Sequence, residues 1–362
     1  MGRGFNGMVM DVYSSNPSDT QHFVALLEAL PSNVSWKIYT TSSKEKHVKS
    51  ASDKKRILDA MKRHASEYVA KITMSRVSVS QKTVFHNEIK ASASIMHAYG
   101  PAAAAKHLTL GALPVSKDMH VLAVVVPSRN IYCMFNIRCT KTLDKIDTWS
   151  SDAEFKRMVV QLLTSVGILH KNKWLHTDLK PDNFMYCEAS KRYKLIDFGG
   201  AIQFTSPKQF DSQLTFLTVT RTRSPIAWYV AGANRTMSAT MSKMVVALLY
   251  RWQFIGSTLL TQAVDDMING FYKKVSKSSD DDAMRCSMVE SMLPCIDTMS
   301  LGLALMSIVM QSDNKTEGGL SIPARNRIVK FVTERMLRMD HSRFLGHDAS
   351  KLAEKAEKEL LS

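Results

Sequence analysis

Cysteine is sparse in this chain and shows no pairing pattern. The cysteines are scattered, no two of them form a Cys-x-x-Cys pair, and their number is odd. A disulfide framework is typical of cysteines in even number, and a zinc site needs cysteines at short spacing. The sequence therefore predicts reduced thiols rather than disulfides or a zinc site. The five residues are Cys133, Cys139, Cys187, Cys286 and Cys295.

Long apolar runs are also missing. The most apolar stretches, residues 120–127 and 244–250, are much shorter than the roughly 18 residues that a membrane span needs. The N-terminus lacks the apolar stretch of a signal peptide, and Asn6 stands where the myristoylation pattern has Ser or Thr. We therefore expect a soluble intracellular protein, cytoplasmic or nuclear, that does not enter a membrane.

Acidic residues are outnumbered. The 33 Asp and Glu residues stand against 48 Lys and Arg, which gives a formal charge of +15. Such an excess attracts polyanions, for example nucleic acid, acidic protein surfaces or phosphate-bearing ligands. The same excess can serve solubility alone, so charge does not define the function. With 45% hydrophobic residues over 362 positions, the chain can form two modest domains or one bilobal domain.

The first third of the sequence predicts mixed strands and helices. Apolar residues at helical spacing follow Asp53, a candidate N-cap, and continue to Ile72. A second helical pattern spans residues 81–99. Alternating or apolar runs predict strands at residues 7–13, 34–40, 120–126 and 131–137.

Beyond about residue 140 the pattern becomes mainly helical. Residues 151–172 begin with Ser151 and Glu154, which have the spacing of a capping box, and continue as an apolar stripe. The expected fold class is α+β, with a small β-containing unit followed by a larger helical unit. Short strands are predicted at 184–187 and 193–198, and later helices at 242–252, 292–310 and 326–339.

Polar residues that suit phosphate chemistry gather in two short stretches. Residues 176–183, HTDLKPDN, place Asp178, Lys180 and Asn183 between apolar flanks. Asp197 begins the stretch DFGG at the end of a predicted strand. Two such stretches with this strand context and spacing rarely arise together by chance.

On these residues the sequence resembles the eukaryotic-type protein kinase superfamily. The resemblance implies a bilobal kinase-like fold that uses ATP and Mg²⁺. It makes Asp178 the catalytic base, Asn183 a magnesium ligand, and Asp197 the carboxylate that chelates the magnesium between the β- and γ-phosphates. Lys180 would neutralise the transferring γ-phosphate, as in serine/threonine kinases.

The resemblance extends to residues that would bind the nucleotide. Gly2, Gly4, Gly7 and Val9 fit the glycine-loop pattern that closes over ATP phosphates, although little of a preceding strand is present. The adenine is expected to contact the link at residues 135–139, through Asn136 and Arg138. This link divides an N-lobe, 1–138, from a C-lobe, 139–346, which a helical tail follows at 347–362.

A lysine on a strand and a glutamate on a helix should form the ion pair that kinases need. Lys37 is the predicted lysine, and Glu88 its predicted partner, with Glu67 as the alternative. The long separation implies an insertion, which residues 43–76 fill. This insertion carries ten Lys or Arg against four acids, so we expect contact with a polyanion, nucleic acid or acidic protein, unless it is only a solvated helix.

Some positions depart from the family pattern. Thr177 replaces the Arg that receives an activation-loop phosphate, so activity without that phosphate is expected. Pro225 matches the end of the activation segment, but Ile226 replaces its Glu, whose usual Arg partner is present as Arg343. The Asp that normally opens the next helix is not visible, and Thr240 lies near its place. Together with the 22 methionines and the unusual N-terminus, this divergence resembles that of kinases of large DNA viruses.

The sequence therefore predicts a serine/threonine protein kinase acting on protein substrates, which can include acidic ones. Two alternatives remain open. A pseudokinase scaffold is favoured by the departure at Ile226, and the presence of Asp178 and Asp197 argues against it. A small-molecule kinase of the aminoglycoside-phosphotransferase kind tolerates a residue other than Arg before its Asp, but it lacks the Lys180-Pro181 pair.

Overall fold

The structure is a computed structural model with two compact units. One unit contains residues 1–140 and 185–199, and the other contains residues 141–184 and 200–362. The predicted lobe boundary at residue 138 stays a prediction. The structure describes residues 2–4, 7–15, 21–42, 45–73, 79–146, 149–203, 297–298, 300–309, 320–337 and 349–361.

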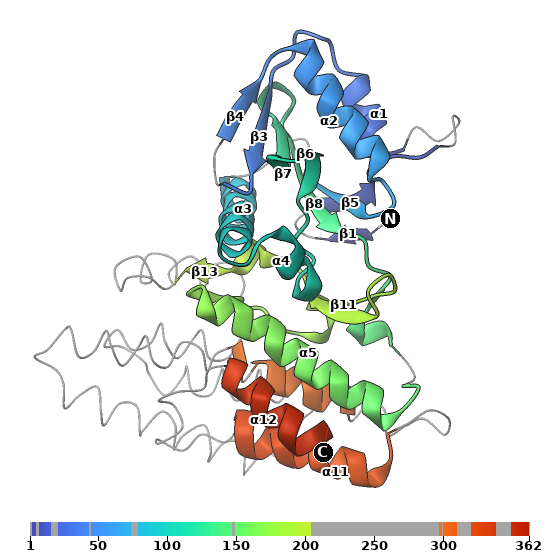
Figure 1. Ribbon diagram of the computed structural model, residues 1–362, viewed down its shortest axis with the longest axis vertical. Helices are drawn as coiled ribbons and strands as arrows, with labels where there is room; N and C mark the ends of the chain where they lie inside the picture. Colours follow the sequence, from blue (N-terminus) through green and yellow to red (C-terminus); the bar gives the residue numbers. More distant parts are fainter. Residues whose placement is uncertain are drawn as a thin grey trace, which may run out of the picture. The chain divides into compact units, whose positions relative to one another are not determined.

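The first unit is built on an antiparallel sheet with the strand order β1-β2-β5-β8-β7-β3-β4, and β6 pairs with β7 (Figure 1). The predicted strands at 7–13, 34–40, 120–126 and 131–137 are confirmed as β2, β3, β7 and β8. The strands are β1 (Gly2–Gly4), β2 (Gly7–Asp11), β3 (Trp36–Thr40), β4 (Glu45–Val48), β5 (Tyr68–Thr73), β6 (Leu113–Ser116), β7 (Met119–Val126) and β8 (Ile131–Ile137).

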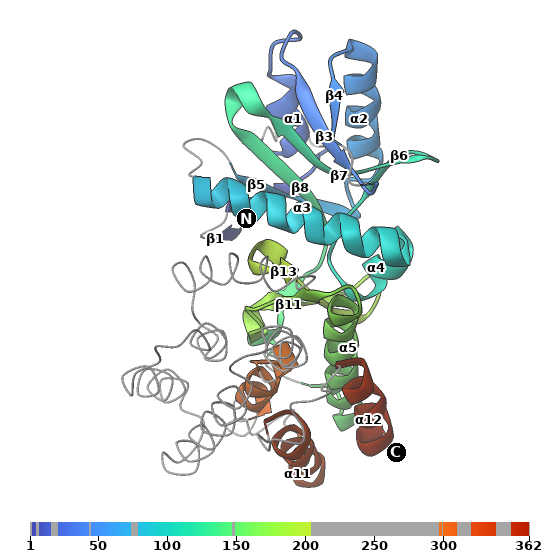
Figure 2. The same ribbon diagram turned by 90° about the vertical axis from the view of Figure 1, so that its left-hand side faces the viewer.

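Helices cover both faces of this sheet. Helices α1 (Phe23–Glu28) and α2 (Ala51–Arg63) pack on one face, where Phe23 and Met61 meet strand residues such as Ile38. Helix α3 (Val79–Tyr99) packs on the other face through Phe85 and Ile89, and Figure 2 shows this helix running along the sheet. Because side chains alternate along a strand, successive residues of β7 and β8 supply the two cores.

The predicted helix from Asp53 to Ile72 is wrong in its second half. Helix α2 ends at Arg63, and a turn leads into β5. The N-cap of α2 is Ser50 rather than the predicted Asp53. The Ser50 hydroxyl accepts a hydrogen bond from the Asp53 backbone N–H at 3.1 Å. Residues 68–73, YVAKIT, contain β-branched and aromatic residues that favour a strand once a sheet is available to pair with.

A short helix and a hairpin complete the first unit. Helix α4 (Pro101–His107) follows α3, and the 3₁₀ turn η1 (Pro127–Arg129) joins β7 to β8. Strand β11 (Phe184–Cys187) lies where the sequence predicts it, and β12 (Arg192–Leu195) confirms only the first half of the strand predicted at 193–198. They lead to the 3₁₀ turn η4 (Phe198–Gly200), which contains the DFGG stretch after Asp197.

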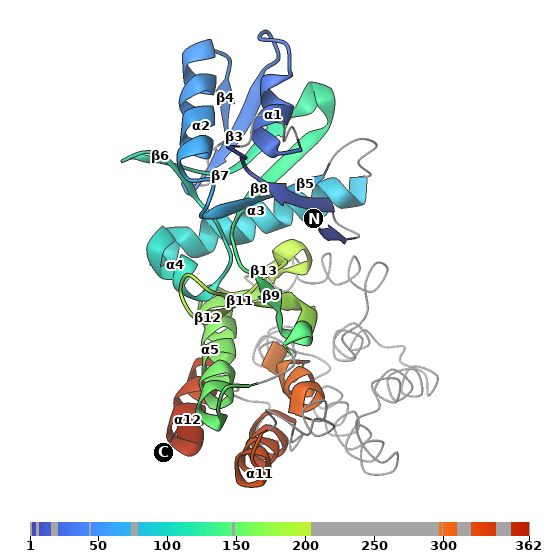
Figure 3. The same ribbon diagram turned by 90° about the vertical axis from the view of Figure 1, so that its right-hand side faces the viewer.

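The second unit has a helical centre. The Ser151 hydroxyl caps the predicted helix, now α5, and accepts a hydrogen bond from the Glu154 N–H at 3.2 Å. Helix α12 packs along α5, where Gly167 leaves no room for a Cβ beside Ser350 (Figure 3). Its elements are β9 (Lys141–Thr142), η2 (Leu143–Lys145), α5 (Asp152–Lys171), β10 (Trp174–Leu175), η3 (Pro181–Asn183), β13 (Ile202–Gln203), α11 (Ile322–Phe331), the π-helical η6 (Val332–Leu337) and α12 (Ala349–Leu361).

Two cysteines of the first unit are joined. Cys139 and Cys187 form a disulfide, with their Cα atoms 4.2 Å apart. The prediction of reduced thiols is therefore wrong for this pair, because pairing depends on distance in space and these residues are 48 positions apart in sequence. Cys133 is a buried free thiol, whose pKa burial raises. Among the described residues, no helix is both long and apolar enough to cross a membrane.

Candidate active site

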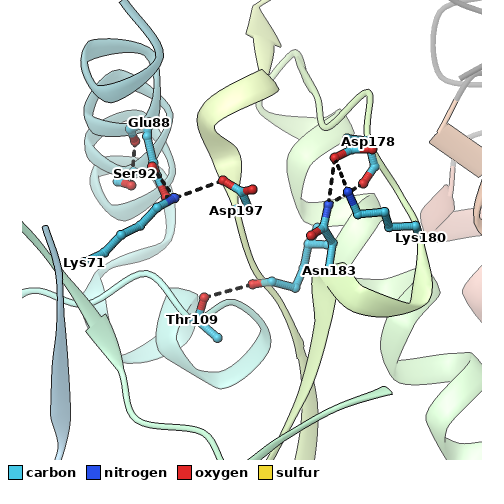
Figure 4. A network of polar contacts seen from close by, with 9 residues as sticks. Lys71, Glu88, Ser92, Thr109, Asp178, Lys180, Asn183 and Asp197 are labelled. Carbon is cyan, nitrogen blue, oxygen red and sulfur yellow. Dashed lines mark hydrogen bonds and ion pairs between the residues drawn. The ribbon is translucent and has the colours of Figure 1, made fainter. Parts of the chain in front are cut away.

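In the first unit, a lysine lies between two carboxylates. Lys71 of β5 is 2.8 Å from Glu88 of α3 and 2.9 Å from Asp197, which follows β12 (Figure 4). Both oxygens of Glu88 accept from the Lys71 Nζ. The sheet, a helix and the end of a hairpin therefore each contribute one member of this cluster, which we call the lysine triad.

The lysine triad is held in a low-dielectric environment. Glu88 is buried, and its helix is fixed in place by its packing on the sheet. Burial alone lowers the pKa of Lys71, but the charges of Asp197 and Glu88 outweigh it and raise that pKa. Burial raises the pKa of Glu88, and Lys71 opposes this shift. Lys71 is therefore a permanent cation at neutral pH.

The predicted pairing of Lys37 with Glu88 is wrong. Lys37 lies on β3, is one-third exposed, and forms an ion pair with Glu45 of the neighbouring β4 at 2.8 Å. Glu88 instead pairs with Lys71, which is only 17 residues before it. The preference for Glu88 over Glu67 is supported, since Glu67 is exposed and contacts His64.

The residues that this chain has in addition to the family pattern therefore lie before β5, the strand that carries Lys71, rather than after the strand of the predicted lysine Lys37. Helices α1 and α2 and strands β3 and β4 lie between β2 and β5 in sequence, and the two strands extend the far edge of the sheet. The predicted insertion at residues 43–76 therefore contains part of this addition, but it also includes β5, which carries Lys71.

The glycine-rich segment forms a hairpin next to the lysine strand. Gly2 pairs with Val9, and Gly4 with Gly7. Strand β2 then pairs with β5, and Val9 lies directly opposite Lys71. The sheet register thus brings the predicted phosphate-binding glycines beside the lysine triad, and nucleotide binding by them stays a prediction.

The predicted adenine-binding link is tied to the sheet. Asn136 lies opposite Val69 of β5, and the Arg138 backbone N–H donates to the Glu67 carbonyl at 2.8 Å. The Arg138 guanidinium forms an ion pair with Asp11 at 2.8 Å and also donates to the carbonyls of Ala65 and Tyr68. These contacts hold the link against β2 and β5, and adenine recognition by Asn136 and Arg138 stays a prediction.

In the second unit, the stretch HTDLKPDN forms a compact polar loop. The Lys180 Nζ lies 2.8 Å from an Asp178 carboxylate oxygen, and Asn183 Nδ2 donates to the same oxygen at 3.1 Å. Asn183 also donates to the Asp178 backbone carbonyl at 2.7 Å. The 3₁₀ turn η3 places Asn183 so that it reaches back, and the Asp178 carboxylate is oriented by two donors (Figure 4).

A buried aspartate anchors the backbone of this loop. Asp297 is fully buried and accepts the backbone N–H of His176 at 2.7 Å and that of Thr177 at 2.9 Å. His170 lies 3.2 Å from the same carboxylate. Burial alone would raise the pKa of Asp297, but the hydrogen bonds with His170 and His176 lower it.

Asp297 corrects one expectation from the sequence. The Asp that normally opens the helix after the activation segment is not visible in the sequence near Thr240; Asp297 is helical, and so are the apolar residues 300–309. The available signal was a carboxylate at the start of the apolar stretch 297–309. It lies about 120 residues beyond the loop it binds, so proximity in sequence could not identify it.

Thr177 adopts a conformation that side chains rarely take. Its φ is 68°, and its hydroxyl donates to the Gly200 carbonyl at 2.8 Å. Asp197 is also left-handed, with φ of 60°. Strained residues of this kind persist where surrounding contacts fix them, often at functional sites. Pro225, Ile226, Thr240 and Arg343 lie outside the described residues.

Each unit offers one oxygen ligand of the kind that magnesium prefers, Asp197 in the first unit and Asn183 in the second. Asp197 offers a carboxylate, and Asn183 uses its amide nitrogen toward Asp178, which leaves the amide oxygen as the ligand atom. Magnesium prefers oxygen ligands and commonly takes one or two from a protein, with the rest from water and substrate phosphates. The described residues contain no cluster of three or more His, Cys, Asp or Glu side chains that could hold a metal ion, and magnesium binding by Asp197 and Asn183 stays a prediction.

Comparison with known proteins points to one family. The family model described as "Protein kinase domain" matches residues 55–231. This range contains the lysine triad and the polar loop around Asp178, and it begins after the glycine hairpin.

Curated relatives match over shorter segments. "Serine/threonine-protein kinase SSN3" of Candida albicans is 34% identical over 24% of this chain and 15% of its own, and "Serine/threonine-protein kinase ppk23" of Schizosaccharomyces pombe is 36% identical over 25% and 20%. "Probable cell division control protein 7 homolog 2" of Encephalitozoon cuniculi is 47% identical over 13% of each. The chain thus spans a fifth or less of the length of these relatives.

Proposed function

We propose that this chain, whose residues 55–231 match the protein kinase domain, transfers the γ-phosphoryl group of ATP to serine or threonine hydroxyls of proteins. The lysine triad is the main support for this proposal. A lysine held between a buried glutamate and the aspartate of a DFG stretch is a preorganised phosphate site, because its geometry is fixed before the nucleotide arrives.

Each residue has a role that its contacts support. Lys71 would bind the α- and β-phosphates while Glu88 keeps it in place. Asp178 would accept the proton of the substrate hydroxyl, and Lys180 would pass from Asp178 to the γ-phosphate as charge develops there. Asp197 and Asn183 would hold magnesium, which neutralises phosphate charge when bound. Most of the catalysis would come from positioning and electrostatics.

Two finer features belong to the same proposal. Thr177 cannot attract a phosphate, so the enzyme would work without activation-loop phosphorylation. The exposed cations Lys46, Lys55 and Arg63 of the added β4 and α2 would attract acidic substrates. The buried Lys54 is excluded from this surface, since it donates to the carbonyls of Ser32 and Val34. An intracellular location, where ATP is made, is also part of the proposal.

The test is phosphate transfer from radiolabelled ATP to a panel of acidic and basic proteins, with magnesium present. Wild type should label at least one protein, and Asp178→Asn should be at least a hundredfold slower, because a general base contributes about 10²–10⁴. Asp182→Asn changes an exposed carboxylate of the same loop and should match wild type. Nucleotide binding without transfer would indicate a scaffold, and labelling of an aminoglycoside alone would indicate a small-molecule kinase.

A further inference from the structure

Four basic residues meet where α4 ends beside β12. Leu108, which follows α4, forms a parallel bridge with Leu195, and the Thr109 N–H donates to the Leu195 carbonyl at 3.0 Å. Alternate residues of a strand share a face, so Arg192 and Lys194 of β12 lie on one side. Lys106 and His107 form the last turn of α4. We call these four residues the basic cluster.

Burial makes this cluster unusual. Lys194 is only 4% exposed, and the Arg192 Nε is buried without a hydrogen-bond partner among the described residues. The described residues also provide Lys194 with no carboxylate. The Lys194 Nζ is not among the buried atoms that lack a partner, so the ammonium group reaches solvent at the end of a buried stem, without an anionic partner among the described residues, which a lysine of such low exposure normally has.

The electrostatics of the cluster agree with its geometry. Burial and then Arg192 lower the pKa of Lys194 to about 8. Burial, Arg192, Lys106 and Lys194 together lower the pKa of His107 to about 4. Arg192 therefore disfavours the charged form of Lys194, and the charges of Arg192, Lys106 and Lys194 disfavour that of His107, which is the local condition that an anion relieves.

We propose that the basic cluster binds the phosphate group of a phosphate monoester, with Lys194 and Arg192 as the main contacts. A guanidinium and an ammonium group together supply several donors to the oxygens of one phosphate, and a dianion offsets more of the accumulated charge than a carboxylate does. The phosphate can belong to a small molecule or to a phosphorylated side chain of another protein. This site does not depend on the proposed kinase activity.

The experiment uses the full chain and inorganic phosphate as the probe. Binding is followed by isothermal titration, and thermal unfolding is recorded with phosphate or with chloride at equal ionic strength. Lys194→Met removes the central charge at similar volume. Lys117→Met, in the exposed turn between β6 and β7, is the matched control. Lys71→Met tests whether phosphate binds at the lysine triad instead.

Phosphate should bind wild type and Lys117→Met alike and raise their unfolding temperatures, while Lys194→Met should bind at least tenfold more weakly. Without phosphate, Lys194→Met should unfold at the same or a higher temperature than wild type, because it removes an unpaired charge at the end of a buried stem. A lower unfolding temperature would show that Lys194 already has an acidic partner within the chain and would overturn the proposal. Phosphate binding that Lys71→Met loses and Lys194→Met keeps would also overturn it.

A phosphoserine peptide and its unphosphorylated form then identify the source of the phosphate. Competition by the phosphorylated peptide alone supports a phosphoprotein ligand, and binding of free phosphate without such competition supports a small molecule.

Discussion

Replacing Asp297 by Asn tests whether a distant carboxylate holds the polar loop around Asp178. Its two oxygens accept separate backbone N–H groups, at 2.7 Å from His176 and 2.9 Å from Thr177. Asparagine keeps one acceptor oxygen and turns the other position into a donor that faces an N–H. The variant therefore loses one hydrogen bond to a charged acceptor and leaves one buried amide without a partner.

The size of the effect follows from these contacts. A hydrogen bond to a charged group contributes about 1.5–3 kcal/mol, and an unsatisfied buried amide costs about 1–3 kcal/mol. The loss of free energy is partly offset, because Asn carries no charge and therefore no carboxylate has to be desolvated. We expect the free energy of opening the loop to fall by about 3 kcal/mol, which corresponds to exchange about a hundredfold faster at these amides.

Hydrogen exchange followed by mass spectrometry measures this on peptides that cover residues 174–184. Asp182→Asn, an exposed carboxylate in the same loop, is the control and should leave exchange unchanged. If Asp297→Asn exchanges as slowly as wild type at His176 and Thr177, Asp297 does not hold the loop, and the reasoning is refuted.

The stability lost in Asp297→Asn should also depend on pH. The pKa of Asp297 lies below its usual value of 3.8 in the folded protein, so its ionised form stabilises the fold. This contribution is complete above about pH 5 and is lost as the pH falls through the lowered folded pKa. The stability difference between wild type and Asp297→Asn should therefore be constant near neutral pH and shrink in acid below pH 3.8.

Four other predictions address the remaining corrections and proposals. Lys71→Met should reduce phosphate transfer at least a hundredfold while Lys37→Met stays within about threefold, since only Lys71 contacts Glu88 and Asp197; the opposite order in an ATP assay would restore Lys37 as the phosphate-binding lysine. Cys139→Ser should lower the free energy of unfolding in urea by about 4 kcal/mol, as expected for a 48-residue loop, and reductant should erase the difference; reactive thiols at both cysteines of the oxidised protein would rule out the bond. Phosphatase treatment should change the initial rate less than about tenfold, because Thr177 offers a phosphate no cation; a hundredfold loss that rephosphorylation restores would show that another cation has taken over. Combined Lys46→Glu, Lys55→Glu and Arg63→Glu should weaken binding of acidic protein and flatten its salt dependence; unchanged affinity at low and high salt would leave a solvated surface as the interpretation.

Features that depend on neighbours along the chain could be predicted from the residue pattern. Asp178, Lys180 and Asn183 lie within six residues, so one turn of backbone brings them together wherever that loop folds. The helix at 81–99 and the capped helix from Ser151 follow from apolar periodicity and from a side chain that caps its own helix. These patterns act between residues that are close in sequence, so they can be recognised without knowledge of the fold.

Tertiary structure decided the features that join distant segments. Lys37 and Lys71 each lie on a strand, and only the strand order shows that β5, beside the glycine hairpin and α3, presents its lysine to Glu88. The apolar spacing up to Ile72 fits a helix as well as a strand, and pairing of β5 with β2 and β8 selected the strand. The Asp297 contact and the disulfide join residues about 120 and 48 positions apart, a distance in sequence over which only the folded chain sets proximity.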